Sequence, residues 1–348
     1  MNYLRPHLEQ LAGYVSGEQP QSGKFIKLNT NENPYPPSPA VIRAIETAAR
    51  SGLGRYPDPV ATTFRHRAGE LLNVEPESII CGNGSDELLT MLVRATVGEG
   101  QLVRTPYPSY VLYRTLAEIQ AARCEEVPFQ SDWSLPDAFS TDAAGLRLVL
   151  LPNPNSPSGT VVSRDAVRDM AGRLPCLLVV DEAYVDFADA DCLSLARECE
   201  NVVVTRTLSK SYALAGLRFG FAVAASAVIA ALHKIKDSYN CDALSIAAAT
   251  AALDDQDWLR DTTAKIKATR ARLTSQLREL GFEVTESQAN FVWCTHPARP
   301  AKTLYDELKA RHILVRYMEY PGWGDGLRIS VGTDEQIDAC LTLLGELL

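Results

Sequence analysis

Short continuous runs of apolar residues alternate with helical patterns through the middle of the chain. The apolar runs, rich in Val, Ile and Leu, cover 78–82, 146–152, 176–181, 201–206 and 219–224. Apolar residues at helical spacing cover 86–97, 109–120 and 163–174. Strands buried on both faces are continuously apolar, which is typical of a parallel sheet covered by helices. We therefore predict an α/β fold with a mainly parallel central sheet flanked by helices.

The pattern changes on either side of this region. Residues 1–40 are rich in Pro, Asn and Gly, and NTNENPYPPSP (29–39) predicts an extended arm. A long helical segment runs from about 245 to about 280, where Gly281 is suited to end a helix. Residues 282–348 follow the order strand, strand, helix, strand, helix. We expect an N-terminal arm (1–40), a large domain (41–245) and a small α+β domain (246–348) that includes the arm.

Composition narrows the class of protein. A hydrophobic content of 46% and a charged content of 22% are ordinary for a globular chain. The net charge of −9 argues against nucleic acid or an anionic membrane as the main partner. No apolar run approaches the ~18 residues of a membrane span, and the first residues resemble no targeting peptide, so we expect a cytoplasmic protein. The eight cysteines include no CxxC pair, which favours small buried residues over a metal site.

Polar residues follow several of the predicted strands at the point where each strand ends. Asp181 closes one apolar run, Asn155 follows a second, Lys210 follows a third, and the turn GNGSDE (82–87) follows a fourth. Ligands in open α/β sheets gather outside the carboxyl ends of the strands. The sequence therefore predicts one shared site at this edge of the sheet.

Two of these features are ambiguous when taken alone. The glycines of GNGSDE and the helix start behind them suit an anion, but a plain capped turn has the same sequence. The spacing matches neither a Walker loop nor a dinucleotide fingerprint. Asp181 is equally suited to a structural salt bridge, although Tyr184, three residues on, can present its hydroxyl to the same place.

The segment around Lys210 carries the most specific chemistry. A lysine with apolar flanks can have its pKa lowered by desolvation, and a neutral amine is a nucleophile. Arg218 offers a planar fork suited to phosphate, and Thr207 and Ser209 offer short hydroxyl donors. The alternative is an ordinary surface loop with an ordinary lysine and arginine. The apolar flanks argue against this alternative.

TLSKSYALAGLRFG (207–220) resembles the lysine segment of the histidinol-phosphate aminotransferase family, class II pyridoxal-phosphate-dependent enzymes of fold type I. LNTNENPYPPSP, RYPDP, GNGSDE, VDEAYVDF and GLRISVGT are similar to motifs of the same family and stand in matching order. The resemblance spans nearly the whole chain, from Tyr14 to Thr333.

The resemblance implies a role for each matching residue. Lys210 would form the Schiff base with pyridoxal 5'-phosphate and act as the base, Asp181 would hold the ring nitrogen protonated, and Tyr184 would contact the phenolic oxygen. The implied cofactor-binding set comprises Gly84, Ser85, Asp86, Tyr110, Asn155, Asp181, Tyr184, Thr207, Ser209, Lys210 and Arg218, with Tyr56 reaching the cofactor phosphate of a neighbouring subunit in a homodimer. The loop NPNSPSG departs from the usual NPNxPTG: Ser158 replaces Thr, and Ser156 takes a position often held by Asn, which leaves Asn155 as our choice for the ring contact.

For the substrate, the resemblance implies that Arg328 and Arg316 grip an anionic group, with Tyr14 and Asn31 as further contacts. Two guanidiniums suit a phosphate dianion. The alternative for Arg316 is a surface residue at a strand end. The implied reaction transfers the amino group of L-histidinol phosphate to 2-oxoglutarate, giving imidazole acetol phosphate and glutamate in histidine biosynthesis. An aromatic amino-acid aminotransferase, a lyase resembling threonine-phosphate decarboxylase and a non-enzymatic binding protein remain alternatives.

Overall fold

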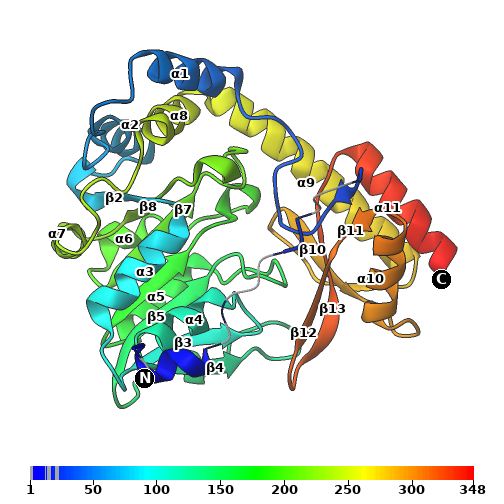
Figure 1. The fold of residues 1–348 in the computed structure, drawn as a ribbon. Helices are drawn as coiled ribbons and strands as arrows, with labels where there is room; N and C mark the ends of the chain where they lie inside the picture. The colour runs from blue at the N-terminus through cyan, green and yellow to red at the C-terminus, as the bar shows by residue number, and fades with distance from the viewer. Residues whose placement is uncertain (1–2, 12, 14–16, 20–22) are drawn as a thin grey trace.

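A seven-stranded sheet forms the centre of the larger part of the molecule (Figure 1). The structure is a computed structural model that describes residues 3–11, 13, 17–19 and 23–348. The strands, in spatial order, are β2 (Ile79–Gly82), β8 (Gly220–Val223), β7 (Val202–Thr207), β6 (Leu177–Asp181), β5 (Leu146–Pro152), β3 (Leu102–Tyr107) and β4 (Arg123–Pro128). Strand β8 runs antiparallel to both of its neighbours, and the other pairs are parallel. The predicted fold class, with a mainly parallel sheet, is confirmed.

Successive residues of the central strands enter two different cores, one on each face of the sheet. In β6, Leu178 and Val180 pack into one core and Val179 into the other. The first core receives residues of α1 (Pro39–Arg50), α2 (Thr62–Leu72), α5 (Arg164–Arg173), α6 (Leu195–Glu198) and α8 (Ala243–Asp254). The second receives residues of α3 (Ser85–Thr96), α4 (Leu112–Ile119) and α7 (Ser226–His233). Burial on both faces is why the apolar runs of β5, β6 and β7 are nearly continuous.

The sequence pattern did not predict β3 and β4, because charged residues interrupt both. The Arg104 side chain in β3 is buried, donating to Glu125 of β4 (2.7 Å) and to the Phe139 carbonyl (3.2 Å). Strand β4 is the sheet edge, where partly exposed charged side chains are tolerated. A buried but fully paired arginine therefore looks polar in the sequence while it occupies a core strand.

A second, antiparallel sheet lies at the other end of the molecule (Figure 1). Its strands, in spatial order, are β12 (Arg316–Tyr320), β13 (Gly324–Ser330), β10 (Phe291–Thr295) and β9 (Glu283–Val284). Helices α10 (Ala301–Ala310) and α11 (Asp334–Leu347) and the end of α9 (Gln256–Glu279) build its core. Where the pattern predicts one strand after α10, the structure has β11 (Ile313–Leu314) and the hairpin β12–β13.

The N-terminal segment joins both parts of the molecule. The 3-10 helix η1 (Pro6–Gln10) lies against α4, and β1 (Ile26–Lys27) pairs in parallel with β11. Residues 28–38 form bends and segments without regular secondary structure, and the predicted extended arm stays a prediction. The remaining 3-10 helices are η2 (Pro76–Ser78), η3 (Asp137–Ser140), η4 (Val185–Phe187) and η5 (Ala215–Leu217).

Helix α9 runs from the large sheet to the small one (Figure 1). Its first turns contribute Leu259 to the core of the large sheet, and its last turns contribute Leu273 and Leu277 to that of the small sheet. It ends just before Gly281, whose φ of +85° suits glycine, as predicted. The division of the chain at 40 and 245 stays a proposal. Helix α8 spans residue 245 and packs against α1 and α2. None of the helices in the described parts of the chain is long and apolar enough to cross a membrane.

The fully buried Leu150 of β5 should be one of the costlier truncation sites. Leu150→Ala removes apolar contacts between the sheet and its second core, and we expect a loss of about 2–5 kcal/mol in unfolding free energy. Urea denaturation followed by circular dichroism measures it. The matched control is Val161→Ala, because Val161 is exposed, and its effect should stay within about 0.5 kcal/mol. Equal effects of the two substitutions would contradict the assignment of β5 to the core.

Candidate active site

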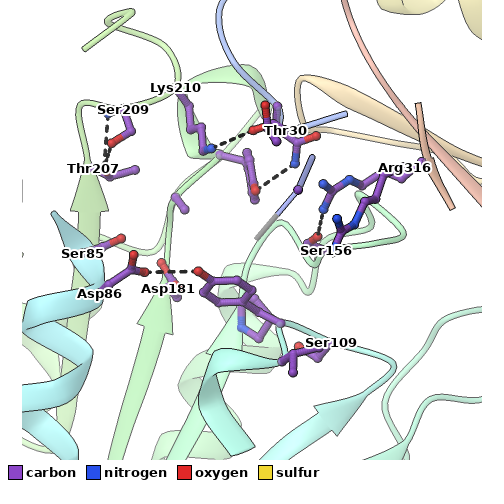
Figure 2. A pocket seen from close by; sticks show the side chains of 18 of the residues that line it. Thr30, Ser85, Asp86, Ser109, Ser156, Asp181, Thr207, Ser209, Lys210 and Arg316 are labelled. Carbon is purple, nitrogen blue, oxygen red and sulfur yellow. Dashed lines mark hydrogen bonds between the residues drawn. The ribbon is translucent and has the colours of Figure 1, made fainter. Parts of the chain in front are cut away.

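A cavity of about 430 Å³ opens where the carboxyl ends of the central strands face the small sheet. Figure 2 shows side chains from the strand ends on one side and from the small sheet on the other. Asp181, Lys210 and the GNGSDE turn reach the same cavity, as predicted. The crossover connections between parallel strands bring these residues together, because all of those strands end at one edge.

Lys210 lies three residues beyond the end of β7, and its partly buried side chain lines the cavity. Its Nζ donates a hydrogen bond to the Thr30 carbonyl (3.3 Å) and lies 5.9 Å from the centre of the Tyr184 ring (Figure 2). Burial, followed by the positive charge of Arg328, lowers the pKa of Lys210 to about 8. A larger fraction of this amine is therefore neutral and nucleophilic near neutral pH than of an exposed lysine.

Asp181 is the last residue of β6 and is buried at the floor of the cavity. It accepts hydrogen bonds from the Tyr113 hydroxyl (2.8 Å) and from Thr205 Oγ1 (3.1 Å). Burial nevertheless raises its pKa to about 6, because neutral donors offset only part of the desolvation. A cation in the cavity would lower this pKa and complete the pairing.

The GNGSDE turn and the Lys210 loop form a cradle suited to an anion. Gly84 precedes α3 with a φ of +80°, and no side chain caps this helix start. Arg218 donates to Asp86 (3.2 Å) and to Ser209 Oγ (3.3 Å), and Thr207 Oγ1 donates to Ser209 Oγ (3.0 Å). A Cβ at position 84 would lie 2.5 Å from the guanidinium of Arg218, and the φ of +80° favours glycine there. The helix N-terminus, the hydroxyls and Arg218 together suit a phosphate group.

Tyr110 and the NPNSPSG loop flank the cavity. Tyr110 lines it and donates to Asp86 Oδ1 (3.3 Å). Asn155 is buried outside the lining, where its Nδ2 donates to the Pro108 carbonyl (3.3 Å) and to Ser158 Oγ (2.9 Å). Ser156, the alternative weighed from the sequence, does line the cavity. The contact between Asn155 and the cofactor ring stays a prediction. Of the two loop side chains, Ser156 lines the cavity and Asn155 does not.

Arg316 and Arg328 lie on the side of the cavity away from the cradle, where Figure 2 shows Arg316. They are directly opposite each other on β12 and β13. Arg328 donates to Ser156 Oγ (2.9 Å) and to the Asn29 carbonyl (3.1 Å), and its guanidinium lies 5.3 Å from the centre of the Phe291 ring. The Arg328 Nε is buried without a partner among the described residues. This end of the cavity is therefore prepared for an anionic group.

Three other predicted residues have different placements. Asn31 lines the cavity but is buried, with hydrogen bonds to the protein described below. Tyr56 is 80% exposed, stacks on Tyr239 at 4.4 Å between ring centres, and does not line the cavity. Its predicted contact needs a second subunit and stays a prediction. Tyr14 lies outside the described residues.

The sequence did not reveal several residues of the cavity. Tyr113 pairs with Asp181, Thr30 accepts from Lys210, and Ser109 and Met318 line the walls. The only hint for Tyr113 was its helical spacing from Tyr110, three residues earlier. The others carry no recognisable pattern, because their positions depend on the paths of loops and on the pairing of β12.

These residues fit pyridoxal phosphate group by group. Lys210 can bond to the aldehyde carbon, the carboxylate of Asp181 can pair with the ring nitrogen, and the Tyr184 hydroxyl can reach the phenolic oxygen. The cradle matches the phosphate in charge and in its open helix start. Among the described residues no group of His, Cys, Asp and Glu side chains is arranged to hold a metal ion.

Comparisons with known proteins identify the family. Residues 23–344 match the family model for aminotransferase class I and II. A relative named histidinol-phosphate aminotransferase from Rhodopirellula baltica is 60% identical, with 98% of this chain and 94% of the relative covered. The chain belongs to the histidinol-phosphate aminotransferase family. A second family member, from Trichormus variabilis, is 47% identical over all of this chain and 99% of its own length.

The solved structures show the same fold. The histidinol-phosphate aminotransferase of Sinorhizobium meliloti, crystallised with pyridoxal-5'-phosphate, superposes with a TM-score of 0.89 at 29% identity, over all of this chain and 98% of its own. That protein is therefore a fold match over the full length.

The lowered pKa of Lys210 predicts how the protein without cofactor captures pyridoxal phosphate. The neutral amine reacts, so the capture rate should rise with pH and reach half its maximum near pH 8, compared with about 10.4 for an ordinary lysine. Stopped-flow absorbance across pH 6–11 measures the rate. Nα-acetyl-lysine is the control amine, and Lys210→Ala should show no borohydride-stable attachment. A midpoint as high as that of the control would contradict the desolvation argument.

Proposed function

We propose that this protein catalyses the pyridoxal-phosphate-dependent transfer of the amino group of L-histidinol phosphate to 2-oxoglutarate, giving imidazole acetol phosphate and glutamate in histidine biosynthesis. The observation that carries the proposal is the pair Arg316 and Arg328, directly opposed across β12 and β13 and facing the cavity. Two guanidiniums suit a phosphate dianion in the first half-reaction. In the second, the same pair must accept a carboxylate of 2-oxoglutarate.

Lys210 is the base in this proposal. Its side chain lines the cavity beside Thr30, with Ser209 of the cradle on one side and Arg316 on the other (Figure 2). With an amine substrate in the cavity, the Lys210 amine would take the proton from the substrate Cα. Its lowered pKa suits this role, because a base is most effective when its pKa is near the working pH.

Asp181 and Tyr184 hold the charges in place. Pyridoxal phosphate, when bound, supplies an electron sink through its ring. The Asp181 carboxylate keeps the ring nitrogen protonated, and the Tyr113 and Thr205 hydroxyls fix its orientation. The Tyr184 hydroxyl donates to the phenolic oxygen. The cradle anchors the phosphate away from the reacting atoms.

We also propose that the protein acts as a homodimer in the cytoplasm. Tyr56 and Tyr239 form an exposed aromatic stack, which is the kind of surface that protein interfaces cover. Burial of this stack by a second copy would account for its exposure here. Tyr56 would then reach the cofactor phosphate of the neighbouring subunit.

The substrate proposal is tested by comparing kcat/KM for histidinol phosphate with that for phenylalanine, using 2-oxoglutarate as acceptor. We expect histidinol phosphate to be preferred. Arg316→Ala should lower its kcat/KM by roughly 100-fold through the loss of a charged hydrogen bond, with a smaller effect on phenylalanine. Unphosphorylated histidinol is the matched control substrate. An unchanged preference in Arg316→Ala would rule out the phosphate role of this arginine.

The same assay separates the rival activities. A preference for phenylalanine would make the protein an aromatic aminotransferase. Histidinol phosphate has no carboxylate to lose, so its turnover to imidazole acetol phosphate would exclude a dedicated decarboxylase.

A further inference from the structure

A chain of hydrogen bonds links the small sheet to Tyr184 through Asn31. Ser330, the last residue of β13, accepts a hydrogen bond from the Asn31 backbone N–H (2.8 Å). The Ser330 hydroxyl also lies 2.9 Å from Asn31 Oδ1, and Asn31 Nδ2 lies 3.0 Å from the Tyr184 hydroxyl oxygen. Asn31 and Ser330 are 1% and 3% exposed, so water has little access to either.

The donors and acceptors along these hydrogen bonds follow one order. Because Ser330 Oγ already accepts from the backbone N–H, its single proton is available to donate to Asn31 Oδ1. With the Asn31 amide turned the other way, that buried proton would lose its acceptor, which is unfavourable. Asn31 Nδ2 therefore faces Tyr184 as a donor.

The donor role of the Asn31 amide determines where the Tyr184 hydroxyl donates its proton. The phenol oxygen receives a hydrogen bond from Asn31 Nδ2, so its own proton must point elsewhere. The cavity is the open direction, because Tyr184 lines it. We infer that Asn31, oriented by Ser330, is a positioning residue that keeps the Tyr184 hydroxyl a donor to the phenolic oxygen of the cofactor. The inference rests on the proposed function only in requiring the cofactor to bind in this cavity.

The surroundings of Asn31 support a positioning role over a direct substrate contact. Its backbone carbonyl accepts from Asn290 Nδ2 (2.9 Å), so both backbone polar groups and both side-chain ends are engaged within the protein. Its φ of 55° lies in the left-handed region, which Asn and Asp tolerate better than other residues with a side chain. The residue is thus held at a conformation that few replacements allow.

The same hydrogen bonds are connected to Arg328, the arginine proposed to bind substrate. Arg328 and Ser330 are two residues apart on β13, and Arg328 donates to the carbonyl of Asn29, two residues before Asn31. The 29–31 segment is therefore held by β13 at both ends. The charged groups that act on Tyr184 are Arg328, Asp181 and Asp86, with Lys210 beside its ring.

Asn31→Asp tests the direction without changing the shape of the side chain. A carboxylate only accepts, so Tyr184 should turn its proton to position 31 and abandon the phenolic oxygen. A donor to that oxygen favours its deprotonated form, so losing the donor should raise the midpoint of the pH-dependent change in the visible band of the bound cofactor. We expect a rise of roughly one pH unit in the holoenzyme without substrate, similar to that of Tyr184→Phe.

The double variant separates this route from the added charge. If Asn31→Asp acts through Tyr184, its shift should largely disappear in the Tyr184→Phe background. Shifts that add in the double variant, or an Asn31→Asp midpoint within about 0.3 units of the wild type, would overturn the inference. The readout uses no substrate, so it holds whichever amine the enzyme prefers, and failure of the substrate proposal is seen separately in kcat/KM.

Ser330 provides a second test that leaves position 31 intact. Ser330→Ala removes the hydroxyl that fixes the Asn31 amide, and the midpoint should rise by less than in Asn31→Asp. Ser330→Thr keeps the hydroxyl and is the matched control, with a midpoint near that of the wild type. Equal midpoints for Ser330→Ala and the wild type would contradict the orienting role of Ser330, even if Asn31→Asp does not fold.

Discussion

The buried carboxylate of Asp181 is the charge around which the cavity is organised. It stands at the end of the central strand β6, where burial raises its pKa to about 6 and two neutral hydroxyls stabilise its ionised form only in part. A protonated ring nitrogen would supply the missing positive charge. The electrostatic requirement of the protein and that of the cofactor are thus complementary, and each favours the ionised form of the other.

The same low-polarity environment shifts the pKa of the Lys210 amine in the opposite direction. Burial disfavours its charged form, so the pKa falls to about 8 while that of Asp181 rises. Both shifts bring the groups toward the pH range in which proton transfer is useful. The cavity therefore needs to be largely closed by protein, and the 29–31 segment and β13 supply that wall.

The sequence predicted those parts of the fold and site that depend on local pattern. Strands such as β5 and β6 were visible because burial on both faces makes them continuously apolar, and Asp181 and Lys210 could be grouped because parallel strands end at one edge. Strand β3 was not predicted, because the buried Arg104 makes it look polar and the sequence does not reveal the hydrogen-bond partners of this arginine. The choice between Asn155 and Ser156 could not be made either, since it depends on the path of one loop.

The facing positions of Arg316 and Arg328 have a consequence for how this scaffold can diversify. Like charges directly opposite each other on paired strands repel, so the hairpin retains them at some cost in stability. Both arginines belong to the small sheet, whereas Asp181 and the Lys210 loop belong to the large one. Changes in β12 can therefore alter which anion is accepted while the groups that perform the proton transfer stay untouched. Strand β13 serves both purposes, because Arg328 faces the substrate end of the cavity and also lowers the pKa of Lys210.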